Sequence, residues 1–141
     1  MKYLIAILAA ATLFAQANDE SIPVRDVIQR YVLAREMRDS KAIGVLFTED
    51  ADQLVSDGVW RKGREAIVKG TLESSQRNSG RRTIEVQTVR FLTPEAAIAD
   101  CRYTLGDRRM WTSIVLTRTG GGGWLIAGIR NMLPTGQAPP K

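Results

Sequence analysis

The residues with the clearest chemical potential are an arginine, an aspartate and a serine, each in a strand-like stretch. The segment GGWLIAGIRNMLP is apolar from Trp124 to Ile129, and Arg130 then stands where another aliphatic residue would fit the pattern. Asp100 and Ser113 lie in two earlier segments. A guanidinium can orient a carboxylate or enolate-like ligand through paired N–H donors. A carboxyl group in a dry cavity can act as an acid or a base.

The composition narrows this chemistry, because the chain of 141 residues has no histidine and one cysteine. Histidine is the commonest general base and transition-metal ligand. We therefore expect no metal site and no cofactor, and any catalysis would depend mainly on carboxylates, tyrosine, lysine or arginine. Cys101 has no partner for an intramolecular disulfide and is expected to be a small buried apolar residue.

The first seventeen residues have the pattern of a secretory signal. Lys2 supplies a positive charge, residues 3–14 form an apolar stretch too short to span a bilayer, and Ala15-Gln16-Ala17 is a small-x-small cleavage site. We expect residues 1–17 to be removed, giving a periplasmic or secreted product without a membrane partner; the alternative is an uncleaved N-terminal anchor. The formal charge of +5 is scattered apart from two arginine pairs at predicted turns, so no nucleic-acid partner is expected.

The first elements expected to position these groups are two helices. Apolar residues at helical spacing, Tyr31 among them, predict a helix from about residue 21 to residue 38. Asp39 or Ser40 can cap a second, short helix that turns Phe47 inward.

A third helix is expected after a short hairpin. The hairpin has a strand at 53–55, a turn at 56–58 and a return through Trp60, and the helix runs from residue 64 to about 76. The stretch GREAIVKGT superficially resembles a phosphate loop, but its lysine precedes the glycine and no strand leads tightly into it. We interpret it as helix.

The second half of the chain changes to the alternating periodicity of strands. The parity of the apolar residues changes between Val86 and Val89, which predicts a bulge near Gln87-Thr88. Three further strands are expected, at residues 96–105, 108–119 and 124–132. Three helices followed by an antiparallel meander predict one α+β domain over 18–134, with a loose tail at 135–141.

The two hairpins in this meander predict which residues face one another. A two-residue turn at Gly106-Asp107 places Asp100 opposite Ser113, and a symmetric four-glycine loop places Ser113 beside Arg130. These side chains then form one row on one face of the sheet, while the other face is almost wholly apolar. We expect the face with the row to line a pocket. We expect the apolar face to be buried against a second subunit, which predicts a homodimer through the sheet.

A buried Arg130 needs a partner, because an unpaired desolvated charge costs on the order of several kcal/mol. Three interpretations stay open: pairing with Asp100 to fix the strand register, orientation of an anionic ligand, or a solvent-exposed strand end. Asp50 and Asp52 are expected to cap or solvate a turn. The candidate ligand-binding residues are Tyr31, Trp60, Asp100, Trp111, Ser113 and Arg130, with Asn131 also near the rim.

The helices, the segment LFTEDADQLVSDGVWRKGREAI and the segment GGWLIAGIRNMLP together resemble the SnoaL-like and ketosteroid-isomerase-like superfamily. This is the fold shared with nuclear transport factor two and with the SgcJ/EcaC-type proteins. The resemblance covers about residues 22–134. It implies a cystatin-like cone in which three N-terminal helices pack on a curved antiparallel sheet and enclose a pocket, and many members dimerise through the sheet.

The functional residues of that superfamily carry over only in part. Tyr31 resembles the helix-one tyrosine with which the steroid isomerases stabilise an oxyanion. Gap-free counting places their general-base aspartate at Val55 and their second oxyanion acid near 116–118, where this chain has no carboxylate. A two-residue shift would reach Asp57, which we interpret as a turn residue. The resemblance therefore argues against steroid isomerisation.

The function we expect is that of a secreted or periplasmic SnoaL-like domain that binds a small, anionic, partly apolar molecule in a conical pocket. One alternative is an isomerase, cyclase or lyase that uses Asp100 or Tyr31; another is a non-catalytic dimerisation module. An open cavity with Asp100 unpaired would favour the enzyme, and Asp100 locked to Arg130 would favour binding or structure. A cavity filled by side chains would favour the module.

Overall fold

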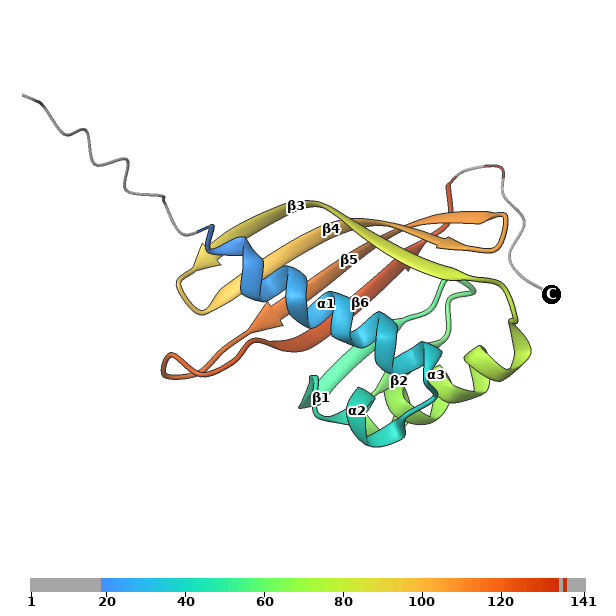
Figure 1. Ribbon diagram of the computed structural model, residues 1–141, viewed down its shortest axis with the longest axis horizontal. Helices are drawn as coiled ribbons and strands as arrows, with labels where there is room; N and C mark the ends of the chain where they lie inside the picture. The colour runs from blue at the N-terminus through green and yellow to red at the C-terminus, as the bar shows by residue number, and fades with distance from the viewer. Residues whose placement is uncertain (1–18, 135, 137–141) are drawn as a thin grey trace, which may run out of the picture.

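The computed structural model describes residues 19–134 and 136, so the expected signal at 1–17 and most of the expected tail at 135–141 lie outside the described residues. Figure 1 shows helices gathered on one face of a twisted sheet. The elements are α1 (Ser21–Glu36), α2 (Ser40–Gly44), β1 (Phe47–Leu54), β2 (Trp60–Lys62), α3 (Arg64–Arg77), β3 (Arg82–Thr93), β4 (Ala96–Leu105), β5 (Arg108–Thr117) and β6 (Leu125–Met132). Within the described residues, no helix is both long and apolar enough to cross a membrane.

The strands form one sheet in the order β2-β1-β6-β5-β4-β3. Strands β3 to β6 are the antiparallel meander that the sequence predicts, and β3 has the expected bulge between Val86 and Thr88. Strand β1 pairs with β6 in parallel, and β2 completes that edge. Helix α3 then carries the chain from the β2 edge to β3 at the opposite edge. The architecture confirms the predicted α+β class.

Helix α1 packs on the apolar face of the sheet, which corrects the expected arrangement. Its buried residues Val24, Val27 and Ile28 belong to one core cluster with Ile114 and Leu116 of β5. An apolar helix stripe is stabilised most by covering apolar residues. The helices therefore take this face, and the face with the polar row is left uncovered in the single chain. The polar row is therefore not enclosed between the sheet and the helices, as was expected.

The helix ends follow from local backbone chemistry. The Asp39 carboxylate accepts a hydrogen bond from the Ala42 backbone N–H at 3.0 Å and caps α2, as expected. Helix α1 ends at Glu36, two residues earlier than predicted, and Arg38 adopts the left-handed region with φ of 54°. This turn directs the chain from α1 into α2.

Strand β1 is longer than the predicted strand at 53–55. Polar residues in β1 obscure its alternation of buried and exposed residues, so the sequence predicted too short a strand. Phe47, which was expected in the second helix, begins this strand. Phe47, Ala51 and Gln53 are buried, whereas Glu49 and Asp50 are exposed. The acidic stretch TEDAD therefore lies in the sheet, and its Asp52 is a strand residue, not the turn residue that was expected.

The predicted register is confirmed for the row, but the β5–β6 pairing shifts by one residue between Val115 and Leu116, so the four-glycine loop does not close symmetrically as expected. Leu105 pairs with Arg108 around a two-residue turn. Asp100 lies opposite Ser113, and Ser113 lies opposite Arg130. The row of three residues is real, although it lies on the face that the helices do not cover.

Candidate functional site

A cavity of about 370 Å³ lies on the helix side of the sheet, where the ends of α1 and α3 meet the β4–β5 hairpin. Four arginines line it: Arg35, Arg61, Arg77 and Arg108. Asp57 is the only acidic residue among its described lining residues. A wall of low exposure is formed by Tyr103, Leu105 and Met110. The cavity therefore combines an excess of positive charge with one mainly apolar side.

Arg35 is the most deeply buried of the lining arginines. It lies one helical turn after Tyr31, so both side chains share the inner face of α1. Arg35 is 4% exposed, and its Nη1 donates a hydrogen bond to the Tyr31 hydroxyl at 3.1 Å. Its Nε has no hydrogen-bond partner, and no carboxylate of the described residues forms an ion pair with it. A cation in this state is costly, so the position favours an anion supplied from outside the chain.

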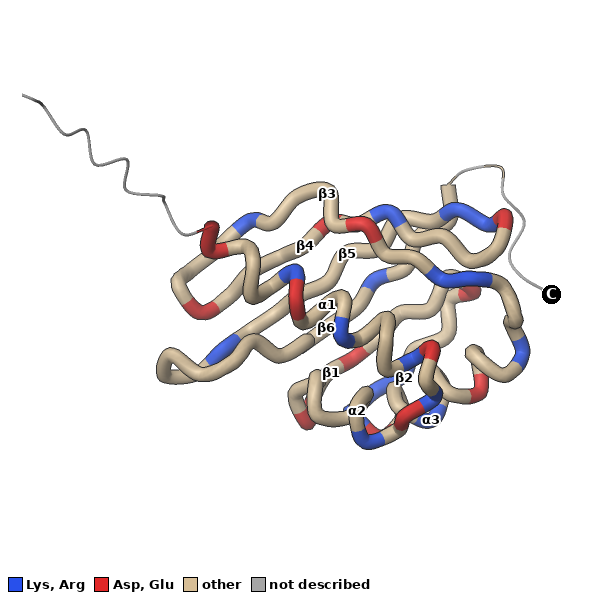
Figure 2. The backbone as a smooth tube through the Cα atoms, viewed as in Figure 1, with Lys and Arg blue, Asp and Glu red and all other residues tan. Residues whose placement is uncertain are grey.

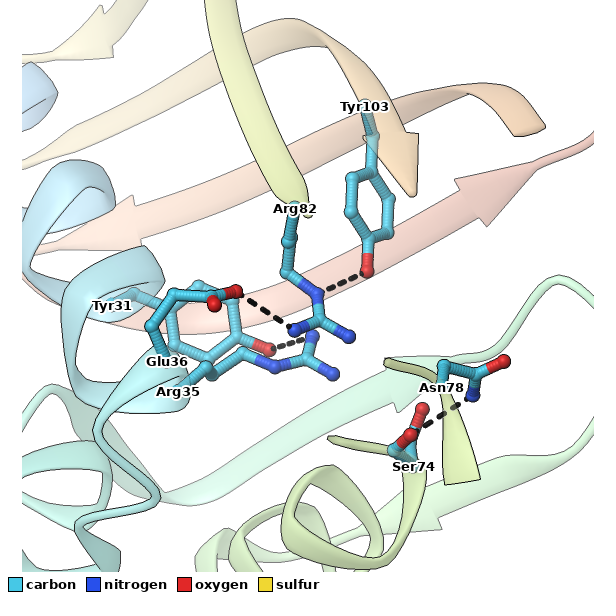
Figure 3. Close-up of polar contacts among 7 residues, drawn as sticks. All are labelled: Tyr31, Arg35, Glu36, Ser74, Asn78, Arg82 and Tyr103. Atoms are coloured by element: carbon cyan, nitrogen blue, oxygen red, sulfur yellow. Dashed lines mark hydrogen bonds and ion pairs between the residues drawn. The ribbon is translucent and has the colours of Figure 1, made fainter. Parts of the chain in front are cut away.

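A second buried arginine lies behind the same wall. Arg82 Nε donates to the Tyr103 hydroxyl at 2.7 Å, and its Nη1 forms an ion pair with the Glu36 carboxylate at 3.3 Å. The Arg82 Nη2 is buried without a partner. Figure 3 shows the guanidinium groups of Arg35 and Arg82 pointing into the same space between the two tyrosines. The half-exposed Glu36 pairs with Arg82 and leaves Arg35 without a carboxylate partner among the described residues.

Arg61 brings a third cation to the cavity from the edge strand β2. Its Nη1 donates to the side-chain Oε1 of Gln53 at 3.0 Å, and Gln53 is 2% exposed on the inner face of β1. Burial lowers the pKa of the Arg61 guanidinium, and repulsion from Arg35 and Arg77 acts in the same direction. Arg35 and Arg77 thus lie close enough to disfavour the charged form of Arg61.

Several basic residues lie at the end of the fold that contains the cavity. Figure 2 shows Lys and Arg at the end of α3, the start of β3 and the β4–β5 hairpin, and also around α2, β2 and the start of α3. Arg77 is the last residue of α3 and is exposed, whereas Arg108 is the first residue of β5 and is half-buried. The cavity opening is therefore basic as well as its floor. No cluster of metal-ligating side chains occurs among the described residues.

The residues singled out from the sequence are divided between the two faces of the sheet. Tyr31 lies on the helix side, 1% exposed, directly behind Arg35. The others lie on the opposite face, outside the cavity: Trp60, Asp100, Trp111, Ser113 and Arg130. Asn131, expected near the rim, does line the cavity. Alternation along the strands fixes this split, because helices cover only one face.

Arg130 pairs with Asp52 and not with Asp100. Its Nη1 lies 2.9 Å from the Asp52 carboxylate and donates to the Ile129 carbonyl at 3.0 Å. Its guanidinium also lies over the Trp60 ring, 4.8 Å from the centroid. Both charged side chains are 35% exposed, so Arg130 forms a partly solvated ion pair between the neighbouring strands β6 and β1.

Asp100 has a different partner from the one expected. The Ser113 hydroxyl donates to the Asp100 carboxylate at 2.5 Å, and Asp100 is exposed. This carboxylate is therefore neither enclosed in a dry cavity nor without a hydrogen-bond partner. The row therefore provides neither an open cavity nor an unpaired acid.

Sequence reasoning missed the cavity residues Arg35, Arg61 and Tyr103, and it missed Arg82, which lies next to the cavity and donates to Tyr103. The spacing of four residues between Tyr31 and Arg35 was a usable signal, since it places the arginine on the apolar stripe of α1. Arg82 was assigned to a turn with Arg81. Only the folded chain brings β3, β4 and the end of α1 together, so no local pattern marks these residues as one site.

The comparisons with known proteins concern the fold. No protein-family model matches the chain, and no curated protein matches its sequence. Among solved structures, the chain is similar to a domain of unknown function with a cystatin-like fold from Nostoc punctiforme. The identity is 24%, the match covers 79% of this chain and 75% of that chain, and the TM-score is 0.66.

Two further structures have the same architecture. An NTF2-like protein with a cystatin-like fold from Novosphingobium aromaticivorans is 22% identical, with 82% of each chain covered and a TM-score of 0.66. A putative calcium/calmodulin-dependent protein kinase II association domain from Xanthomonas campestris is 19% identical, with 86% of this chain and 93% of that chain covered and a TM-score of 0.72. The chain therefore has the cystatin-like α+β cone of the NTF2-like proteins, the fold of the superfamily that its sequence resembles.

Proposed function

We propose that this protein is a secreted or periplasmic SnoaL-like domain that binds a small, anionic, partly apolar molecule in the arginine-lined cavity. The single observation that supports this most is the state of Arg35, a buried guanidinium with no carboxylate partner among the described residues. The cavity volume of about 370 Å³ is in the usual range for small-molecule sites. An SgcJ/EcaC-type relationship stays a prediction from the sequence.

The energetic reason for anion binding is that the cost of desolvating the Arg35 guanidinium is not offset by an ion pair within the described residues. Arg35 is desolvated on burial, and its compensation comes from Tyr31, whose hydroxyl accepts a hydrogen bond and whose ring centroid lies 5.5 Å from the guanidinium. An unpaired buried ion costs several kcal/mol, whereas an anion held by a guanidinium forms short, charge-assisted hydrogen bonds. Binding of an oxyanion at Arg35 would therefore recover free energy that the empty protein lacks.

The enzyme alternative is weaker than the binding proposal. Asp100 lies on the face opposite the cavity and is engaged by Ser113, so it offers no acid or base to a ligand bound there. Tyr31 remains near the cavity, with its hydroxyl hydrogen-bonded to Arg35. It supports anion binding at least as well as catalysis.

Self-association is a separate proposal, and it concerns the outer face of the sheet. This is the face that carries Trp60, Trp111 and Met132, which are 47%, 44% and 44% exposed. The expected dimer used the opposite, apolar face, which α1 already covers. We propose that a second copy of the chain covers the outer face, since large side chains exposed together favour burial.

The binding proposal is tested by replacing the unpaired cation. Wild type, Arg35→Met and Arg130→Met are titrated with acetate, butyrate, succinate and inorganic phosphate while the melting temperature is followed. A ligand that binds only the native state raises the melting temperature. We expect at least one anion to stabilise wild type and Arg130→Met but not Arg35→Met. Equal stabilisation of Arg35→Met, or none for wild type, would contradict the proposal.

A further inference from the structure

We infer that the cavity is built for a dianion, a molecule with two anionic groups joined by a short apolar segment. This inference rests on the proposed function and deepens it by naming the ligand class. It is based on two groups of arginines, one at the buried floor of the cavity (the first level) and one at its opening (the second level), together with the apolar wall of the cavity.

The first level is the buried floor. Arg35 is 96% buried from solvent, being 4% exposed, and its Nε is an unused donor. Arg82, which lies beside Arg35 but does not line the cavity, has a further buried donor without a partner at Nη2. The free groups identified here are donors, so the group that fits them must only accept hydrogen bonds. A fully ionised carboxylate or phosphate meets that condition.

The second level is the opening of the cavity. Arg77 and Arg108 line it, and they are exposed and half-buried respectively, unlike Arg35. They are fixed by the end of α3 and the start of β5. A group bound at the floor therefore leaves two further cations nearer to solvent, where a second anionic group would contact them.

The charge balance favours two negative charges over one. The lining holds four arginines against one aspartate, a formal charge of +3. Asp57, whose carboxylate accepts the Val59 backbone N–H at 3.0 Å, offsets one of these charges and favours the charged form of Arg61, but three positive charges remain. A monoanion would leave most of the repulsion among the arginines in place.

The wall between the two levels is suited to an aliphatic segment. Tyr103, Leu105 and Met110 line it and are 5%, 7% and 5% exposed. Methylene groups that contact these side chains leave water, and each additional buried methylene favours binding. The ligand class is therefore an aliphatic chain with an anionic group at each end, such as an α,ω-dicarboxylate.

The test compares two matched series by isothermal titration calorimetry. The dicarboxylates run from succinate to suberate, and the monocarboxylates of equal length run from butyrate to octanoate. Arg108→Gln removes one cation of the opening. Arg109→Gln, the adjacent residue, is the matched control because Arg109 is exposed and does not line the cavity.

We expect wild type and Arg109→Gln to bind the best dicarboxylate roughly fivefold or more tighter than its monocarboxylate, with an optimum in chain length. In Arg108→Gln this ratio falls toward one while monocarboxylate binding is retained. Equal affinities of the two series in wild type would overturn the dianion inference and leave the proposed function standing. An absence of binding by both series would overturn both.

Discussion

Arg61 crosses helix α3 directly over Gly70. A Cβ placed at Gly70 would overlap the Cδ, Nε and Cζ atoms of Arg61. The missing side chain therefore makes room for the guanidinium to reach Gln53 and the cavity. A glycine inside a helix costs about 1 kcal/mol of helix stability relative to alanine. At Gly70 this cost is offset by the contacts that the Arg61 side chain makes through the space that the glycine leaves.

Gly70→Ala is expected to displace Arg61 without unfolding the protein. The blocking atoms belong to the flexible end of the Arg61 side chain, so that chain can move, and alanine improves helix propensity by up to about 1 kcal/mol. Anion affinity in calorimetry should fall several-fold, while the free energy of unfolding changes by less than about 1 kcal/mol. Gly44→Ala is the matched control, since a Cβ there makes only an ordinary contact with Val68. Unchanged affinity in Gly70→Ala would refute this role for Gly70.

The two buried arginines should differ in their effect on the stability of the empty protein. Arg35→Met removes an unpaired buried charge, and we expect the free energy of unfolding to rise by about 1–3 kcal/mol. Arg82→Met removes a cation that pairs with Glu36 and donates to Tyr103, so it should lower the same quantity by about 1–3 kcal/mol. Urea denaturation in ligand-free buffer measures both. A lower free energy of unfolding in Arg35→Met would mean that the Arg35 charge is compensated in the wild-type protein, which would contradict the prediction.

The sheet register was predictable because it depends on local turns. Gly106-Asp107 fixes a two-residue hairpin, and alternation then assigns Asp100 and Ser113 to one face. Alternation does not say which face the helices cover, because both faces of the meander carry apolar residues. Only the fit of α1 decides this, and the cavity consequently lies opposite Arg130.

The remaining errors involve contacts between distant segments. The pairing of β1 with β6 joins residues 47–54 to residues 126–130, and the acidic side chains in β1 conceal its inward residues. This strand pairing places Arg130 next to Asp52, whereas the sequence suggested Asp100 as its partner. The contact between Arg82 and Tyr103 likewise depends on the alignment of β3 with β4.

The ion pair between Arg130 and Asp52 should contribute little to stability. Both side chains are 35% exposed, and such pairs are typically worth up to about 1 kcal/mol. A double-mutant cycle with Arg130→Met and Asp52→Asn is expected to give a coupling free energy below about 1 kcal/mol that shrinks as salt is raised. A coupling above about 2 kcal/mol would instead mark this pair as strongly desolvated.

Cys101 should make stability fall at high pH. Burial raises the pKa of its thiol from 9.0 to about 12, so above pH 9 the unfolded chain loses a proton that the native chain keeps. The stabilising contribution is thus complete below pH 9 and declines by up to about 1.4 kcal/mol per pH unit above it. Denaturation of wild type and Cys101→Ala between pH 8 and 10.5 should show a shallower decline in the variant. Parallel curves would contradict the assignment.

The outer face of the sheet should determine the oligomeric state. Trp111 is 44% exposed there, and its ring lies 5.4 Å from the Arg102 guanidinium, so the surface offers both apolar area and charge to a second copy. Light scattering coupled to gel filtration should find a dimer for wild type and a monomer for Trp111→Asp, because the substitution removes the exposed indole and puts a carboxylate in the interface that would lose its water shell. Leu33→Asp is the control, since Leu33 is 59% exposed on α1, which packs on the other face. A dimer that survives Trp111→Asp and dissociates in Leu33→Asp would move the interface to the helices.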